Sequence, residues 1–182
     1  MFIALSFVER QYSLVRKHLF RGRKEQGCFL FVKSSIKPSS IEFEVKDIHA
    51  IGAGGWVYQS DCHLELDERE KVEVMLKARE YDCDLMECHS NRFNGPAAFS
   101  PSDVHGLDAF VQYVWWKLPN KLYGAVVFTK NGVRGQIWLP KQSKPLLINE
   151  IRVVDSAGKF KYIVGVPLKK SLLSIFRRWN HG

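Results

Sequence analysis

The stretch CDLMECHSN, residues 83–91, runs into RFNGPAAFSPSD, residues 92–103, and this passage decides how the chain is interpreted. The first half is typical of a β-strand, and the second half is typical of a loop that leads into a helix. Residues two apart in a strand project from the same face, so His89 and Asn91 are expected to point together at the end of a sheet. Asp103 can return to meet them at the start of the next helix. Ligand-capable side chains are thus expected to gather at one sheet edge.

Two interpretations fit this spacing. A histidine, a second ligand two residues later and an aspartate resemble the three protein ligands of a catalytic zinc site, which leaves a fourth position for water. The alternative is structural: Asp103, with Ser100 and Ser102 as further candidates, caps the helix, and His89 is a half-buried histidine. Spacing alone favours the structural alternative.

The first half of the chain predicts a helix, a strand pair and a second helix. Apolar residues at helical spacing indicate a helix over 8–20, and a short apolar run at 28–33 indicates a strand. Alternating residues at 40–51 predict a half-buried strand paired with the one before it, and a flexible glycine-rich loop follows. Residues 67–80 favour a helix with an acidic outer face. Its expected buried side consists of Val72, Met75 and Leu76.

The second half predicts a helix, two hairpins and a closing basic amphipathic helix. Asn131-Gly132 between two β-rich runs is a strong hairpin signal. The expected elements are a helix at 103–118, strands at 122–129 and 133–139, strands at 148–155 and 160–166, and a helix at 168–179. With no linker that separates two units, residues 1–182 are expected to form a single α/β (α+β) domain with a mixed β-sheet flanked by helices.

Composition and length place the chain among globular proteins. It has 182 residues, of which 46% are apolar and 13% aromatic, which suffices for a hydrophobic core. No apolar run approaches the roughly 20 residues that a membrane-spanning helix needs, and the N-terminal segment meets charge at Glu9 and Arg10. Four cysteines without a CxxC pair are expected to be reduced thiols. These features predict a cytoplasmic protein that is neither membrane-bound nor secreted.

The formal net charge of +8 raises the question of nucleic-acid binding. The charge is unevenly distributed, because residues 1–24 and 152–182 are basic whereas residues 61–87 hold ten acids and four bases. Bases interleaved with aromatic residues, which are typical of nucleic-acid binders, are not evident. The sequence therefore argues against a nucleic-acid partner.

The motif His89-Ser90-Asn91, followed by Ser100-Pro101-Ser102-Asp103, resembles the signature of the JAMM (MPN/JAB) metalloproteases. That signature is His-x-His, a spacer and Ser-x-x-Asp. The family also has an essential glutamate on an upstream strand, and Glu25 occupies the corresponding place after the N-terminal helix. The resemblance is closest to bacterial JAB proteins found with ubiquitin-activating-like and conjugating-like enzymes.

The resemblance covers residues 5–140 and leaves a C-terminal hairpin and helix at 141–182 unassigned. It implies a JAMM/MPN-like, cytidine-deaminase-like fold for the domain. It further implies a zinc ion (Zn²⁺) held by His89 and Asp103, with Glu25 as general acid and base. In the same way, it implies that Ser100 donates a hydrogen bond to the developing oxyanion.

Asn91 departs from the pattern, because the family has its second histidine ligand there. A carboxamide oxygen is a poor zinc donor beside an imidazole nitrogen, so we expect metal affinity to fall. Asn91 is a natural degeneration, a deliberate inactivating substitution, or a position for which a neighbour compensates. The candidate neighbours are Cys88 and His105. Cys62-His63 resembles half of a metal site but has no partner pair at zinc-finger spacing.

Two functions follow as expectations from the resemblance. The first is a zinc-dependent isopeptidase or peptidase that removes a ubiquitin-like modifier from conjugates or processes its precursor, in a bacterial conjugation system such as one used against phage. Its partners would be the modifier, its conjugates and the activating or conjugating enzymes. The alternative is a catalytically inactive JAMM-fold domain that binds a ubiquitin-like protein or partner enzyme as a scaffold.

Overall fold

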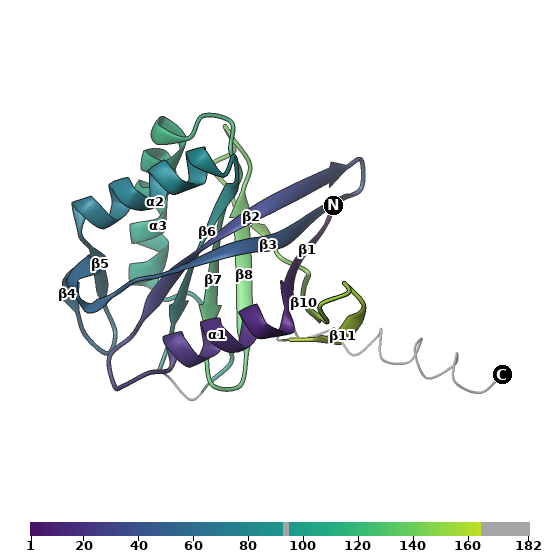
Figure 1. Ribbon diagram of the computed structural model, residues 1–182. Coiled ribbons are helices and arrows are strands. Elements are labelled where there is room, and N and C mark those ends of the chain that lie inside the picture. The colour runs from purple at the N-terminus through teal and green to yellow at the C-terminus, as the bar shows by residue number, and fades with distance from the viewer. Residues whose placement is uncertain (93–94, 165–182) are drawn as a thin grey trace.

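The computed structural model describes residues 1–92 and 95–164, which form a large mixed sheet with helices on both faces (Figure 1). The strand order of the nine-stranded sheet in this part of the chain is β11-β10-β1-β3-β2-β6-β7-β8-β9. Its strands are β1 (Phe2–Val8), β2 (Gly27–Lys37), β3 (Ser40–Ala50), β6 (Asp84–Ser90), β7 (Tyr123–Phe128), β8 (Val133–Trp138), β9 (Leu146–Leu147), β10 (Glu150–Val154) and β11 (Phe160–Ile163). The helices are α1 (Glu9–Leu19), α2 (Glu68–Glu80) and α3 (Pro101–Lys117). A short 3₁₀ turn, η1 (Ala53–Gly55), leads into a separate hairpin of β4 (Trp56–Gln59) and β5 (Leu64–Leu66).

Side-chain alternation along β2 divides the interior into two hydrophobic cores. Cys28 and Leu30 pack on the face covered by α1, whereas Phe29 and Phe31 pack on the face covered by α2 and α3. Figure 1 shows α2 and α3 together on one side of the sheet and α1 on the other. A strand buried on both faces is expected to be apolar throughout, and β2 is buried from Gly27 to Val32.

The mixed α and β architecture predicted from the sequence is confirmed, and so are most of the individual elements. Helices α1, α2 and α3 match the predicted segments within two residues at each end, and the β2–β3 and β7–β8 pairs are antiparallel hairpins. The second hairpin is β10–β11. The predicted helix at 168–179 and the last residues of the predicted strand at 160–166 lie outside the described residues.

The sequence analysis missed β1 and the β4–β5 hairpin. Strand β1 lies between β10 and β3 and runs parallel to both, so it is a central strand of its half of the sheet. Residues 2–8 are apolar enough for this position, but an apolar stretch of that length does not distinguish a strand from a helix. The glycine-rich loop predicted before β4 contains the 3₁₀ turn at 53–55.

The predicted buried side of α2 is partly wrong. Val72 is 46% exposed and Leu76 is 58% exposed, whereas Val74, Met75 and Ala78 are buried. The small side chain of Ala78 lets the helix approach the sheet, so the buried stripe follows Val74 and Ala78, which are four residues apart and therefore on one face. The prediction of an acidic outer face for this helix is confirmed, because the helix carries exposed glutamates.

No helix within residues 1–92 and 95–164 is both long and apolar enough to cross a bilayer. All four cysteines are free thiols, and Cys28, Cys83 and Cys88 are buried. The cores are thus closed by packing and hydrogen bonds.

The central position of β1 predicts a contrast between two of its phenylalanines. Phe7 is fully buried and its ring meets Tyr12 edge-on at a centroid distance of 5.8 Å, whereas Phe2 is 36% exposed. Phe7→Ala should lower the free energy of unfolding by about 3–5 kcal/mol, because it removes a large side chain from a closed core. Phe2→Ala should cost less than about 1 kcal/mol. Urea unfolding measures both, and equal losses would contradict the placement of β1.

Candidate active site

The register of β2 with β6 brings the start of one strand to the end of the other. His89 pairs with Gly27 across the antiparallel ladder. Just beyond, the Gln26 backbone N–H donates to Ser90 Oγ at 3.0 Å, and the Ser90 backbone N–H donates to the Gln26 carbonyl at 2.9 Å. Ser90 is fully buried, so both bonds are shielded from water. These two hydrogen bonds between Gln26 and Ser90, called the Gln26–Ser90 lock below, hold Glu25 next to the His89 end of β6.

Glu25 is held by its backbone and has a buried side chain. Its N–H donates to the Ser60 carbonyl at 2.8 Å, and the Gln59 side-chain amide donates to its carbonyl oxygen at 2.8 Å. The Arg92 side chain donates to the Lys24 carbonyl at 2.7 Å, which also holds the loop that carries Glu25. The Glu25 residue is only 6% exposed. The β4–β5 hairpin is therefore part of the frame that positions this carboxyl group.

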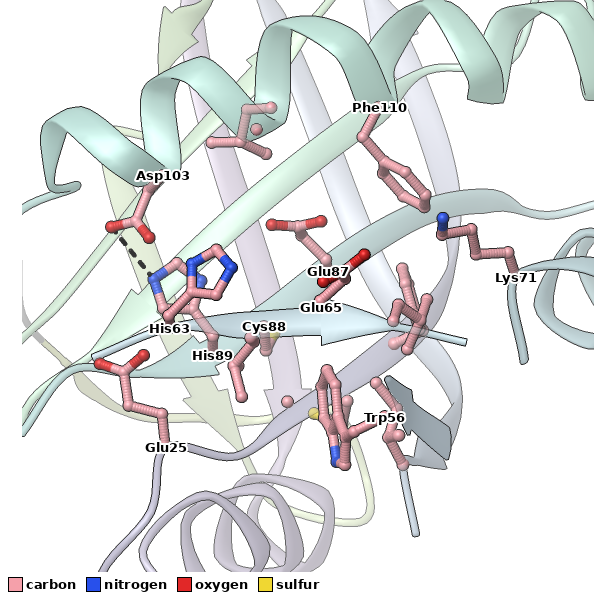
Figure 2. A pocket seen from close by; sticks show the side chains of 18 of the residues that line it. Glu25, Trp56, His63, Glu65, Lys71, Glu87, Cys88, His89, Asp103 and Phe110 are labelled. Atoms are coloured by element: carbon pink, nitrogen blue, oxygen red, sulfur yellow. Dashed lines mark ion pairs between the residues drawn. The ribbon is translucent and has the colours of Figure 1, made fainter. Parts of the chain in front are cut away.

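Asp103 enters the site through the capping of α3. Ser100 is the N-cap: its hydroxyl accepts from the Asp103 N–H at 3.1 Å, and Asp103 Oδ2 accepts from the Ser100 N–H at 2.6 Å. This reciprocal pair is a capping box, and it orients the Asp103 carboxylate. Oδ2 also lies 3.5 Å from His89 Nε2, as the dashed line in Figure 2 shows.

His89 is buried and its Nε2 makes no hydrogen bond with the described residues. The 3.5 Å separation from Asp103 is an ion-pair distance rather than a well-formed hydrogen bond. The ring of Phe99 meets the imidazole edge-on at a centroid distance of 6.0 Å. The ion pair with Asp103 thus leaves this buried ring nitrogen without a well-formed hydrogen bond, which costs free energy.

The three groups perturb one another. Burial raises the pKa of Glu25 to about 7, although the nearby His89 opposes the shift. Burial acts to raise the pKa of Asp103 as well, but the His89 and Ser100 contacts outweigh it and lower that pKa to about 2. For His89, burial acts to lower the pKa, and the Asp103, Glu87 and Glu25 carboxyls together raise it. The protonation of Glu25 therefore changes near neutral pH.

These residues line one end of a cavity of about 460 Å³ that extends between α3, β6 and the β4–β5 hairpin. Glu87, two residues before His89 on β6, projects into the same cavity, and its Oε2 accepts from the Tyr123 hydroxyl at 2.5 Å. Burial raises the pKa of Glu87. Trp56 and Phe110 contribute aromatic walls (Figure 2).

The structure brings together three of the five predicted site residues. Glu25, His89 and Asp103 all line the cavity, whereas Ser100 and Asn91 are not among its lining residues. Ser100, which the structural alternative named as a further candidate, is the N-cap, whereas Asp103 occupies the third helical position. The Asn91 backbone N–H donates to the Phe128 carbonyl at 2.7 Å, just past the end of β6.

Of the two neighbours considered as compensating ligands, Cys88 borders the cavity and His105 does not. Cys88 packs with Cys28 in the core on the α1 side, and His105 lies on the exposed side of α3. His63 does line the cavity, from the loop between β4 and β5. Among the residues that the structure describes, no three His, Cys, Asp or Glu side chains are grouped to hold a metal ion.

Sequence reasoning missed Glu87, Trp56 and Tyr123. Glu87 had a signal, because it lies two residues before His89 and therefore on the same strand face. Trp56 and Tyr123 come from elements far away in the sequence and had none. The contribution of Trp56 depends on the unpredicted β4–β5 hairpin.

Comparisons with known proteins show the fold alone. No protein-family model matches the chain, and no curated protein matches it. Among solved structures, the solution structure of protein DSY2949 from Desulfitobacterium hafniense is similar, with a TM-score of 0.52 and 16% sequence identity over 84% of this chain and 94% of that one. A likeness at this identity supports the mixed α+β architecture.

The capping box generates a prediction that separates two neighbouring serines. Ser100→Ala removes the N-cap hydroxyl of α3 and should lower the free energy of unfolding by about 1 kcal/mol. The matched control is Ser102, an exposed serine two residues later in the first turn of α3. Ser102→Ala should change the free energy of unfolding by less than about 0.5 kcal/mol. Chemical denaturation measures both variants. Equal values for the two would contradict the assignment of Ser100 as the cap.

Proposed function

We propose that the protein is a zinc-dependent hydrolase of amide bonds, of the JAMM type, in which Glu25 is the general acid and base. The observation that carries this proposal is the convergence of Glu25, His89 and Asp103, from three separate elements, at one end of a cavity. The resemblance of the motif at His89 and Asp103 to the JAMM signature supports the same reaction class.

The donor set fits a zinc ion in part. His89 Nε2 is a buried imidazole nitrogen with no hydrogen-bond partner in the described residues, and Asp103 Oδ2 lies beside it at 3.5 Å. Imidazole and carboxylate are both good zinc ligands. In the proposed site these two side chains hold the ion, and Asn91 replaces the third strong donor. When bound, zinc would polarise a substrate carbonyl and lower the pKa of a coordinated water.

Glu25 is suited to move the proton in this reaction. The Glu25 side chain points toward the His89–Asp103 pair in Figure 2. A general base works best when its pKa lies near the operating pH, and burial places the pKa of Glu25 at about 7. The carboxylate accepts a proton from the attacking water and then donates it to the leaving amine. Ser100 Oγ accepts from the Asp103 N–H and keeps its own O–H as a donor. The resemblance assigns this O–H to the developing oxyanion, and Ser100 lies beside the cavity rather than in its lining.

The proposed substrate is a ubiquitin-like modifier joined to a target, or the precursor of such a modifier. This part of the proposal rests on the resemblance to bacterial JAB proteins. It places the protein in the cytoplasm within a conjugation system, including systems used against phage, beside activating and conjugating enzymes. Nucleic acid and membranes have no role in it.

A second function is favoured by Asn91. With His89 and Asp103 as the only strong donors of the motif, the domain could have lost its metal and kept its fold. It would then bind a ubiquitin-like protein or partner enzyme as a scaffold. The two functions differ in whether the purified protein holds zinc.

Restoring the histidine tests the metal site. Asn91→His adds an imidazole donor, so zinc affinity should rise by at least about tenfold relative to the unmodified chain. Competition with a fluorescent chelator measures the affinity, and elemental analysis measures the stoichiometry. His89→Ala in the Asn91→His background is the control and should lose the gain. Tight stoichiometric zinc in the unmodified chain would argue against the scaffold function.

Glu25→Gln tests the catalytic role. Gln has the same shape without a basic carboxylate, so the variant should retain zinc and lose cleavage by about a hundredfold or more. The measurement is release of a fluorescent peptide joined through a lysine side chain to the C-terminus of ubiquitin, in the Asn91→His background. Glu44→Gln, on an exposed part of β3, is the control and should leave the rate unchanged. Undiminished cleavage by Glu25→Gln would contradict the assignment.

A further inference from the structure

Glu87 is a half-buried carboxyl group that the proposed reaction does not use. It projects from β6 on the same face as His89, and its Oε2 is bound by the Tyr123 hydroxyl. Its other oxygen, Oε1, accepts no hydrogen bond from the described residues. The protein surrounds the group, and the surface that it keeps accessible faces the cavity. Oε1 is therefore available to accept a hydrogen bond from a donor that enters the cavity.

The cavity walls beside Glu87 are largely aromatic. Phe110 stacks on Tyr113 at a centroid distance of 5.8 Å and contacts Phe29 at 6.1 Å, so its ring is fixed from two sides. The Trp56 ring lies so close to β2 that a Cβ at Gly27 would come within 2.8 Å of it. Rigid apolar faces suit a hydrocarbon stem, and the faces of aromatic rings also attract a cation.

Carboxyl groups outnumber lysines and arginines in the lining of the cavity, whereas bases outnumber acids in the whole chain. Four carboxyl groups line it, those of Glu25, Glu65, Glu87 and Asp103. Lys71 is the only lysine or arginine among the described lining residues, and its Nζ is engaged by Glu68 at 2.5 Å. A cleft lined by one sign of charge between low-dielectric walls attracts the opposite sign, even though the chain carries a formal net charge of +8.

We propose that this cavity binds the side chain of a basic residue, arginine or lysine, of a polypeptide, with Glu87 as the partner of its cationic head. The aromatic walls hold the methylene stem, and Glu87 Oε1 accepts a hydrogen bond from the guanidinium or ammonium group. A volume of about 460 Å³ accommodates such a side chain with its flanking backbone. Because His89 and Asp103 line the same cavity, this basic residue would stand next to the scissile bond. That last step rests on the proposed hydrolase function.

A pair of isosteric probes tests the charge requirement. Benzoyl-arginine amide and benzoyl-citrulline amide have nearly the same shape, but only the first is cationic. Both are titrated into the full-length protein, and binding is followed by NMR at the indole N–H of Trp56, which is assigned with Trp56→Phe. The arginine probe should bind at least about tenfold more tightly than the citrulline probe, because a charged hydrogen bond in a shielded site is strong.

The Glu87→Gln variant tests whether Glu87 causes the preference for the arginine probe. Its amide oxygen can still accept from Tyr123, so the fold is retained, which thermal unfolding checks. The preference for arginine should fall to less than about threefold. Glu44→Gln removes a glutamate charge from exposed β3 and should keep the full preference. Equal binding of the two probes, binding of neither, or a preference that survives Glu87→Gln would each overturn the inference.

The binding experiment needs neither zinc nor turnover, so its failure is distinct from failure of the proposed function. Cleavage without any preference for arginine would overturn the cavity's specificity and leave the hydrolase function in place. A preference for arginine without cleavage would support the cavity's specificity and overturn the hydrolase function.

Discussion

The rest of the structure depends on the register between β2 and β6. One buried hydrogen-bonded lock, between Gln26 and Ser90, fixes which residue of each strand faces which core. A slip of one residue would move the side chains of His89 and Glu87 to the α1 face, because side chains alternate along a strand. The slip would also bury charged groups in an apolar core, so the correct register is strongly favoured. The candidate site therefore inherits its geometry from the packing of the sheet.

Burying the carboxyl groups of the site costs free energy on folding, and neighbouring side chains offset part of that cost. Glu25 and Glu87 are carboxyls in a largely apolar cavity, and burial raises the pKa of each. The carboxylate forms are stabilised by specific partners: Tyr123 for Glu87, and the nearby His89 for both glutamates. The strongly basic ends of the chain have no part in this cavity within the described residues. The overall charge of a protein is thus a poor guide to the charge of its binding site.

The sequence predicts most of the fold because the elements that carry strong local signals also form the middle of the sheet. The Asn-Gly turn between β7 and β8 and the alternation in β3 depend only on neighbouring residues. Strand β1 was missed because it becomes a strand through pairing with the distant β3 and β10, and the β4–β5 hairpin was missed because its strands are only four and three residues long. The same division applies to the site. The sequence placed Glu25, His89 and Asp103 together, but it could not show that Ser100 caps α3 or that Glu87 faces the cavity.

The hydrogen bonds that hold the candidate site in place do not use the side chain at position 91. The hydrogen bonds that hold β6 against Gln26 use Ser90, and the capping box that orients Asp103 uses Ser100. Neither set of hydrogen bonds involves the side chain at position 91. The Asn91 backbone bond to Phe128 is also available to any residue other than proline. In the proposed site, an exchange between histidine and asparagine at this position would change the metal donors and leave these backbone bonds in place. The cavity and its Glu87 carboxyl would survive such an exchange unchanged, so recognition of a polypeptide does not require that catalysis be retained.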